Sequence, residues 1–148
     1  MKIVLDTNCF ISCIGKRSLY RNVFDEFLKE NYTLCVSTEI LLEYEEIFLV
    51  KWGNEVTENL LSRLIRARNI ELSTVFFNFN MISSDADDNK FADLYLSSNA
   101  DLIVSNDAKI IALNKSNFPK FHVVTLQEFS KMLLEVKAAY NPMNPWKM

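Results

Sequence analysis

Short runs of consecutive apolar residues, rather than alternating ones, recur along the chain and predict strands of a buried parallel sheet. Four runs have this character, at residues 3–5, 32–36, 102–104 and 121–124. A fifth segment, residues 72–79, is rich in Val and Phe and predicts a strand followed by a loop. The chain is therefore expected to contain about five strands that are covered on both faces.

Between these runs, apolar residues recur at helical spacing and predict amphipathic helices. Gly53-Asn54 separates the second predicted helix from the third. The core face of the third helix is expected to consist of Leu60, Leu61, Leu64 and Ile65. The predicted helices span residues 18–30, 38–51, 55–68, 108–113 and 126–139, and a further helix begins at the polar cluster 83–87.

Strands and helices alternate almost throughout. This alternation predicts right-handed βαβ units that form a three-layer α/β/α sandwich around a parallel sheet. The length of 148 residues suits one domain, which we assign to residues 1–140, followed by an irregular tail at 141–148. The apolar fraction of 49% and the charged fraction of 24% are those of an ordinary globular protein.

The composition excludes several classes of function. Neither GxGxxG nor GxxxxGK[ST] occurs, so nucleotide sites built on a glycine-rich loop are excluded. No run of about 18 uncharged apolar residues is found, so no membrane-spanning segment is expected. Three cysteines without a CxxC pair argue against a disulfide framework or a zinc site and favour a reducing cytoplasm. Because the net charge is −3, nucleic acid would have to be held by a local basic patch or by bound cations.

Two carboxylates follow buried strands at the edge of the sheet where ligands of parallel α/β proteins bind. Asp6 comes directly after the run 3–5, and Asp107 follows the run 102–104 after two small polar residues. Carboxylates at neighbouring strand ends repel each other unless a cation lies between them, and oxygen ligands suit Mg²⁺. An aspartate in such a place is also typical of a turn residue that hydrogen-bonds its own backbone.

Two further acids lie on predicted helices. Asp88 is in the opening turn of its helix, where the helix dipole favours an anion, and Asp85 and Asp87 are alternatives to it. Glu43 lies mid-helix after an apolar pair, but periodicity alone does not select it over its neighbours Glu39 and Glu46. A cluster of carboxylates without His or Cys ligands favours Mg²⁺ or Mn²⁺ and implies phosphate-ester chemistry.

Four segments carry a family resemblance, in this order and in agreeing strand and helix contexts: IVLDTN at 3–8, STEILLE at 37–43, DADDNKF at 85–91 and NADLIVSND at 99–107. Together they resemble the PIN-domain family, nucleases that include the toxins of bacterial toxin–antitoxin pairs. The resemblance extends from Lys2 to about Glu135. It implies four catalytic, metal-binding acids, Asp6, Glu43, Asp88 and Asp107, and it is what selects Glu43 over its neighbours.

The resemblance implies a metal-dependent endoribonuclease. In this reading Mg²⁺ or Mn²⁺, one ion or two, activates water for in-line attack on an RNA phosphodiester and leaves a 5′-phosphate and a 3′-hydroxyl. It also implies an antitoxin protein and a second copy of the chain as partners. The alternative is a non-catalytic PIN-like scaffold that binds RNA or a protein, which the presence of all four acids disfavours. An aspartyl phosphotransferase is excluded because Asn8 stands where that chemistry needs a second aspartate.

Polar and basic residues near the four acids complete the predicted site. The candidates to orient carboxylates or water are Asn8, Asn89, Ser105 and Asn106, and the alternative is that they are plain turn and cap residues. Those expected to bind the RNA backbone are Lys16, Arg17, Lys90 and Lys109. His122 is expected to be a packed strand residue, and Phe76, Phe77 and Phe79 are expected to form core and a dimer surface rather than to stack on bases.

Overall fold

The computed structural model describes residues 1–82 and 86–139, and within them the chain forms one sheet of five parallel strands. The strand order is β3-β2-β1-β4-β5. The strands are β1 (Lys2–Leu5), β2 (Thr33–Val36), β3 (Ile70–Leu72), β4 (Leu102–Val104) and β5 (Val123–Val124). Each of the four apolar runs overlaps a strand, and the expected α/β sandwich with a parallel sheet is confirmed. The predicted tail at 141–148 lies outside the described residues.

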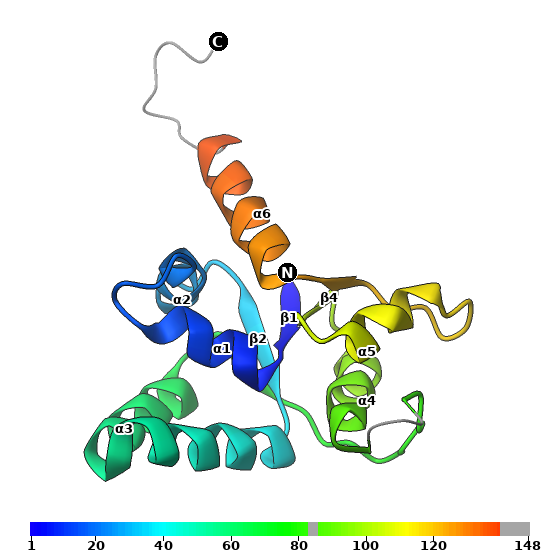
Figure 1. The fold of residues 1–148 in the computed structure, drawn as a ribbon, viewed down its shortest axis with the longest axis horizontal. Helices are drawn as coiled ribbons and strands as arrows, with labels where there is room; N and C mark the ends of the chain where they lie inside the picture. The colour runs from blue at the N-terminus through cyan, green and yellow to red at the C-terminus, as the bar shows by residue number, and fades with distance from the viewer. Residues whose placement is uncertain (83–85, 140–148) are drawn as a thin grey trace.

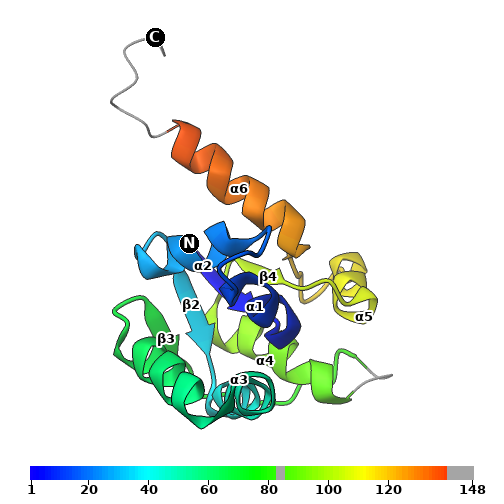
Figure 2. The ribbon, with the colours of Figure 1, turned by 60° about the vertical axis from the view of Figure 1, so that its left-hand side comes forward.

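Helices cover both faces of this sheet (Figures 1 and 2). They are α1 (Thr7–Ile14), α2 (Arg21–Leu28), α3 (Thr38–Arg66), α4 (Asn89–Ser98), α5 (Ala108–Ile111) and α6 (Leu126–Ala139), with short 3₁₀ turns at Ala86–Asp88 and Ala112–Lys115. The last part of α6 extends away from the sheet (Figure 1). In the described part of the chain, no helix combines the length and the apolar character needed to cross a membrane.

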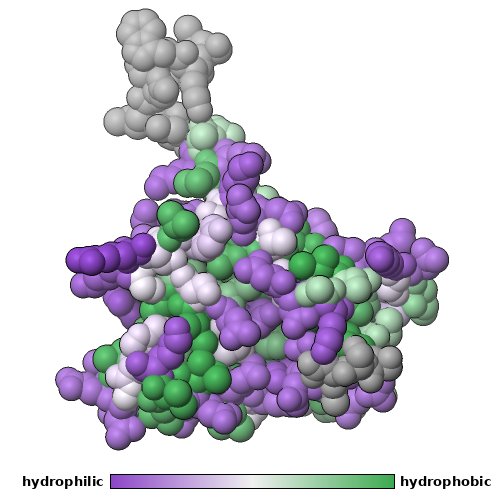
Figure 3. Space-filling model, in the orientation of Figure 1, coloured by the Kyte–Doolittle hydropathy of each residue, from purple (hydrophilic) through white to green (hydrophobic). Residues whose placement is uncertain are grey.

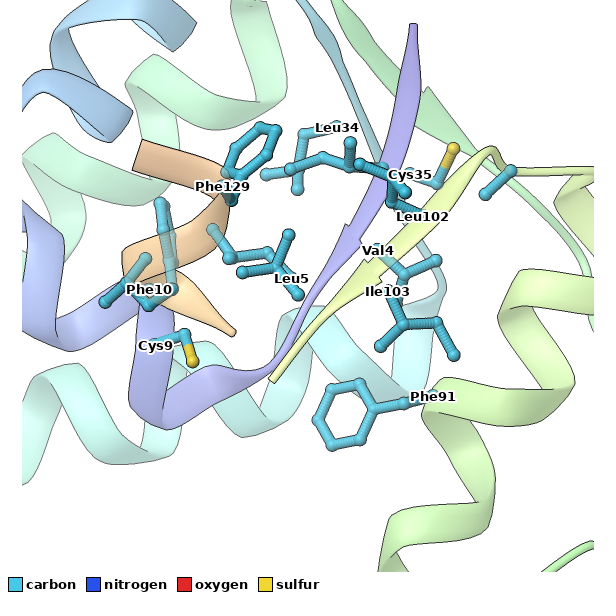
Figure 4. Packing of buried hydrophobic residues seen from close by; sticks show 14 of the residues in the cluster. Val4, Leu5, Cys9, Phe10, Leu34, Cys35, Phe91, Leu102, Ile103 and Phe129 are labelled. Atoms are coloured by element: carbon cyan, nitrogen blue, oxygen red, sulfur yellow. The ribbon is translucent and has the colours of Figure 1, made fainter. Parts of the chain in front are cut away.

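The core consists of two apolar layers, one on each side of the central strands. Figure 4 shows Leu5 on the side of Phe10 of α1 and Phe129 of α6, whereas Val4 and Ile103 point to the side of α4. All five side chains are buried. Because β1 has a neighbour on each side and is buried on both faces, the residue that follows it, Asp6, lies at the centre of the carboxyl edge of the sheet.

The sequence pattern does not predict helix α1, and the burial of this helix explains why. Six of its eight residues are buried: Thr7, Cys9, Phe10, Ile11, Cys13 and Ile14. A helix that is covered nearly all round has no polar face, so the 3.6-residue periodicity that identifies surface helices is lost. The side chain of Asp6 caps this helix by accepting a hydrogen bond from the Asn8 backbone N–H.

Helix α3 consists of two helical segments that meet at Gly53, as the Gly53-Asn54 pair predicts. The φ of +79° and ψ of −177° at Gly53 lie outside helical geometry and create the kink. In the second segment Leu64 is buried, but Ile65 is 65% exposed, so its assignment to the core face is wrong. Successive helical residues are rotated by about 100°, and this segment packs on one side only, which turns Ile65 outward.

The strand predicted within 72–79 starts and ends earlier. Strand β3 ends at Leu72, and residues 73–82 have no regular structure. Phe76, Phe77 and Phe79 are exposed, so the expectation that they form core is wrong. They lie outside the core because the chain leaves the sheet at Leu72, before it reaches them.

Two side chains of α4 hold the end of this segment against the domain. The amide of Asn89 accepts a hydrogen bond from the Ile82 N–H at 2.8 Å and donates one to the Ile82 carbonyl at 2.9 Å. Asp93 accepts a hydrogen bond from the Phe79 N–H at 3.0 Å. Residues 89 and 93 are four apart and share one face of the helix. This face therefore fixes the path of the chain just before the acidic turn that opens α4.

His122 was expected to be packed, and that expectation is also wrong. Its side chain is exposed, and the residue precedes β5 rather than lying inside it. Only its backbone joins the sheet, where the carbonyl of His122 accepts a hydrogen bond from the Ile103 N–H at 2.9 Å.

Candidate metal centre

Asp6 is the most deeply placed of the candidate acids. Asp6 follows β1 directly and is 7% exposed to solvent. Its backbone N–H donates a hydrogen bond to the Val104 carbonyl at 3.0 Å. Its two carboxylate oxygens have different partners. Oδ1 accepts the Asn8 N–H at 3.2 Å, and Oδ2 accepts the hydroxyl of Ser105 at 2.7 Å. Asp6 is therefore fixed from two sides at the tip of the central strand.

Ser105 connects Asp6 to Asp107. The Ser105 hydroxyl, which is completely buried, donates to Asp6 and accepts the backbone N–H of Asp107 at 3.0 Å. Asp107 in turn caps α5, because its Oδ1 accepts the Lys109 N–H at 2.8 Å. One serine side chain thus holds together the ends of two adjacent strands and the two acids that follow them. Asp6 and Asp107 thus follow adjacent strands at the same edge of the sheet.

Glu43 reaches the same edge from helix α3. Its Oε2 accepts a hydrogen bond from the Thr7 hydroxyl, and its Oε1 pairs with the Nζ of Lys90 at 2.9 Å. Thr7 is buried in the first position of α1, directly after Asp6. These contacts bring segments around residues 6, 43 and 90 to one place, although they are far apart along the chain. Thr7 was not among the predicted site residues, although it lies in the segment IVLDTN at 3–8 that carries the family resemblance.

The charges of these acids act on one another. Burial is the largest cause that raises the pKa of Asp6 above its ordinary value, and the nearby charges of Asp107 and Glu43 raise it further. The hydrogen bonds from Ser105 and from the Asn8 backbone act in the opposite direction and are smaller than the effect of burial. A cation bound near Asp6 would offset both the cost of burying its charge and the smaller repulsion by its neighbours.

The third acid of the family pattern lies at the start of α4. Asp88 is half-buried and occupies the N-cap position, whereas Asp87 is exposed and Asp85 lies outside the described residues. The neighbouring Asn89 is engaged with the backbone of Ile82 and contributes to the fold of the loop. Lys90, the second residue of α4, makes the ion pair that joins this helix to Glu43.

The remaining candidates are less directly connected to the acids. The side chain of Asn8 is exposed, and only its backbone contacts Asp6. Asn106 accepts the Leu126 N–H at 3.0 Å and ties the turn after β4 to α6. Lys16 and Arg17 are exposed beyond the far end of α1, which separates them from Asp6 by about 12 Å of helix. Lys109 is exposed in the first turn of α5, next to Asp107.

The chemistry of the donors fits a hard divalent cation. Asp6 and Asp107 supply carboxylate oxygens, and Mg²⁺ is commonly held by one or two carboxylates while it keeps several waters. Across residues 1–82 and 86–139, no three His, Cys, Asp or Glu side chains are placed to hold one ion together. The carboxylate of Glu43 is held by Thr7 and Lys90. Asp6 and Asp107 would hold such an ion together with water.

The protein is thus a five-stranded parallel α/β domain with acids from separate segments at the carboxyl edge of its sheet, the edge where such domains bind ligands. The comparison with protein families identifies the family. The model of the PIN domain matches residues 2–109, and the chain belongs to the PIN domain family. PIN domains are generally nucleases. The resemblance seen in the four sequence segments is confirmed.

Solved structures agree with this assignment. The chain is similar to the crystal structure of VapBC2 from Rickettsia felis bound to a DNA fragment from their promoter, with a TM-score of 0.60 and 18% sequence identity. The similarity covers 84% of this chain and 98% of that chain, and it establishes the common fold. No curated protein shows significant sequence similarity to the chain.

Proposed function

We propose that the protein is a Mg²⁺- or Mn²⁺-dependent endoribonuclease that hydrolyses RNA phosphodiester bonds at the carboxyl edge of its sheet. The observation that carries the proposal is the Ser105 hydroxyl, which holds Asp6 and Asp107 on adjacent strand tips. A buried carboxylate with a second one beside it is costly without a cation, and PIN domains are generally nucleases.

In this mechanism each protein group has a stated task. Asp6 and Asp107 would hold the cation, and Ser105 orients the carboxylate of Asp6 and the backbone that carries Asp107. Glu43 and Asp88 complete the negative environment from α3 and α4. A divalent cation bound there supplies an activated water and offsets charge on the scissile phosphate. The buried position of Asp6 limits competing water on the protein side of the site.

The RNA is held outside the acids by exposed basic residues. Lys109, next to Asp107, is the nearest such candidate along the chain, and Lys16 and Arg17 would contact RNA farther from the cleaved bond. The net charge of −3 makes binding depend on such local contacts and on the bound cation.

The biological setting that we propose is a toxin controlled by an antitoxin, with residues 1–140 as the single nuclease domain. The similarity to the VapBC2 structure supports it. A protein partner is also consistent with the exposed apolar residues of α3, among them Leu49, Val50 and Val56. Figure 3 shows apolar side chains gathered in the region of this helix. The same surface would serve a second copy of the chain.

The test is cleavage of RNA by the purified protein. We expect cleavage with Mg²⁺ or Mn²⁺, none in EDTA, and loss of at least about 100-fold in the Asp6→Asn variant, as for removal of a group that stabilises the transition state. Circular dichroism would verify that the variant is folded. Equal cleavage with and without EDTA would contradict the metal mechanism. Binding of RNA without cleavage under any metal condition would favour the scaffold instead.

A further inference from the structure

Lys90 is a lysine turned into the protein rather than toward solvent. Its side chain is only 10% exposed, and its Nζ lies 2.9 Å from Oε1 of Glu43, whose side chain is 30% exposed. The same ammonium lies 5.4 Å from the ring centroid of Phe91. A lysine seldom gives up its hydration without a compensating negative charge. The position of Lys90 is therefore determined by Glu43.

Both carboxylate oxygens of Glu43 have a partner within the protein. Thr7 donates its hydroxyl to Oε2 while Lys90 pairs with Oε1. Asp6 and Asp107, by contrast, are joined through Ser105 and have no lysine or arginine side chain paired with them within the described residues. Among residues 1–82 and 86–139, the acidic edge thus has two parts: an aspartate pair without a lysine or arginine partner, and a glutamate that has one.

We propose that the ammonium of Lys90 takes the place of a second metal ion. The centre then binds one divalent cation, on the Asp6–Asp107 pair, and Lys90 acts as a positioning residue that holds Glu43. This inference rests on the proposed function. It differs from a role of Lys90 in binding RNA, because an ammonium committed to Glu43 and largely buried is not presented to a phosphate.

The experiment is a titration of the full-length protein with Mn²⁺ alone, followed by calorimetry and by electron paramagnetic resonance of free Mn²⁺. Four proteins are compared: the unchanged chain, Lys90→Met, Lys90→Arg and Lys115→Met. Met has a similar unbranched stem without charge, and Arg retains the charge. Lys115 is exposed at the end of the 3₁₀ turn after α5 and controls for the loss of one lysine.

We expect one Mn²⁺ per chain for the unchanged protein, Lys90→Arg and Lys115→Met, and two for Lys90→Met. Two ions on the unchanged protein, or one ion of unaltered affinity on Lys90→Met, would overturn the inference and leave the proposed function intact. No Mn²⁺ on the unchanged protein would instead contradict the proposed function.

A second measurement tests the inference if the Lys90→Met protein folds poorly. The melting temperature in EDTA and in Mn²⁺ is compared for the unchanged chain and for Lys90→Gln, which retains a polar group near Glu43. An ion that replaces the missing charge should raise the melting temperature of Lys90→Gln more than that of the unchanged protein. Equal increases would overturn the inference. RNA cleavage alone could not make this distinction.

Discussion

At the scale of single residues, Asp107 combines a structural and an electrostatic role. Its Oδ1 caps α5 through the Lys109 N–H, and its charge helps to raise the pKa of Asp6. Asparagine is as good an N-cap as aspartate but carries no charge. Asp107→Asn should therefore stabilise the metal-free protein, by about 1 kcal/mol or roughly 2–4 °C in melting temperature. Thermal unfolding in EDTA measures it.

The matched control is Glu135→Gln, which removes one carboxylate from the exposed surface of α6. Its melting temperature should stay within about 1 °C of that of the unchanged protein, since isolated surface charges contribute little. A lower melting temperature for Asp107→Asn would mean that the acids do not repel one another in the absence of an ion.

Asp93 gives a pH-dependent prediction away from the acids. Burial raises its pKa above the ordinary value, and the hydrogen bond from the Phe79 N–H opposes this only in part. The folded state then holds the proton of Asp93 more tightly than the unfolded chain does. The stability that protonated Asp93 contributes is therefore lost as pH rises through the raised pKa. Asp93→Asn keeps an acceptor for Phe79 and removes the titration.

The free energy of unfolding by urea, measured in EDTA, should therefore favour Asp93→Asn increasingly as pH rises from about 4, the ordinary aspartate value, toward neutrality. Above the folded pKa the difference should become constant. Asp6 also has a raised pKa, but it is present in both proteins, so its effect cancels in the comparison. A difference that is the same at every pH would contradict the assignment.

How well a candidate site residue could be predicted depended on whether it directly follows a strand or lies on a helix. Asp6 and Asp107 follow apolar strand runs, and a parallel sheet brings such positions together at one edge. Glu43 needed the family resemblance, because helical periodicity does not distinguish it from its neighbours. The contacts of Thr7 and Lys90 with Glu43 could not be predicted, since they depend on how three separate helices pack.

At the scale of elements, the two glycines make a matched pair of tests. Gly53 has φ of +79° and ψ of −177°, a region that only glycine occupies readily, although no atom lies within 4 Å of a Cβ placed there. Gly53→Ala should destabilise the protein by about 1–3 kcal/mol through backbone strain alone. Urea denaturation at neutral pH measures the change.

Gly15, at the end of α1, has φ of −60° and ψ of 137°, which alanine adopts freely, and equally open space around its Cβ position. Gly15→Ala should leave the protein unchanged or stabilise it by about 0.4–1 kcal/mol, because it restricts the unfolded chain. If both substitutions had the same effect, the kink at Gly53 would not require a positive φ.

Elements were predictable where burial is one-sided. Helices α2, α3 and α6 each expose one face, and their periodicity was visible. Helix α1 is covered nearly all round and gave no such signal. Strand β3 was predicted too late in the sequence for the opposite reason. Its residues are half-buried or exposed at the edge of the sheet, so the more apolar residues after Leu72 gave the stronger strand signal.

At the scale of the whole molecule, the acids belong to segments that come together only when the sheet is formed. An ion that binds them binds the folded state and not the unfolded chain, so it must stabilise the entire domain. At a concentration of 100 times its dissociation constant, the gain is about 2.7 kcal/mol. For a chain of this length, that corresponds to an increase of roughly 5–10 °C in melting temperature.

Mg²⁺ or Mn²⁺ should therefore raise the melting temperature of the unchanged protein, and the increase should be absent in Asp6→Asn and much reduced in Asp107→Asn. NaCl at matched ionic strength controls for general screening. Asp107→Asn should thus be the more stable protein in EDTA and the less stable one in saturating metal. This crossing arises because the negative charge of Asp107 repels Asp6 in the metal-free protein and attracts the ion when metal is present. Parallel melting curves without a crossing would show that Asp107 contributes to the fold and not to the ion.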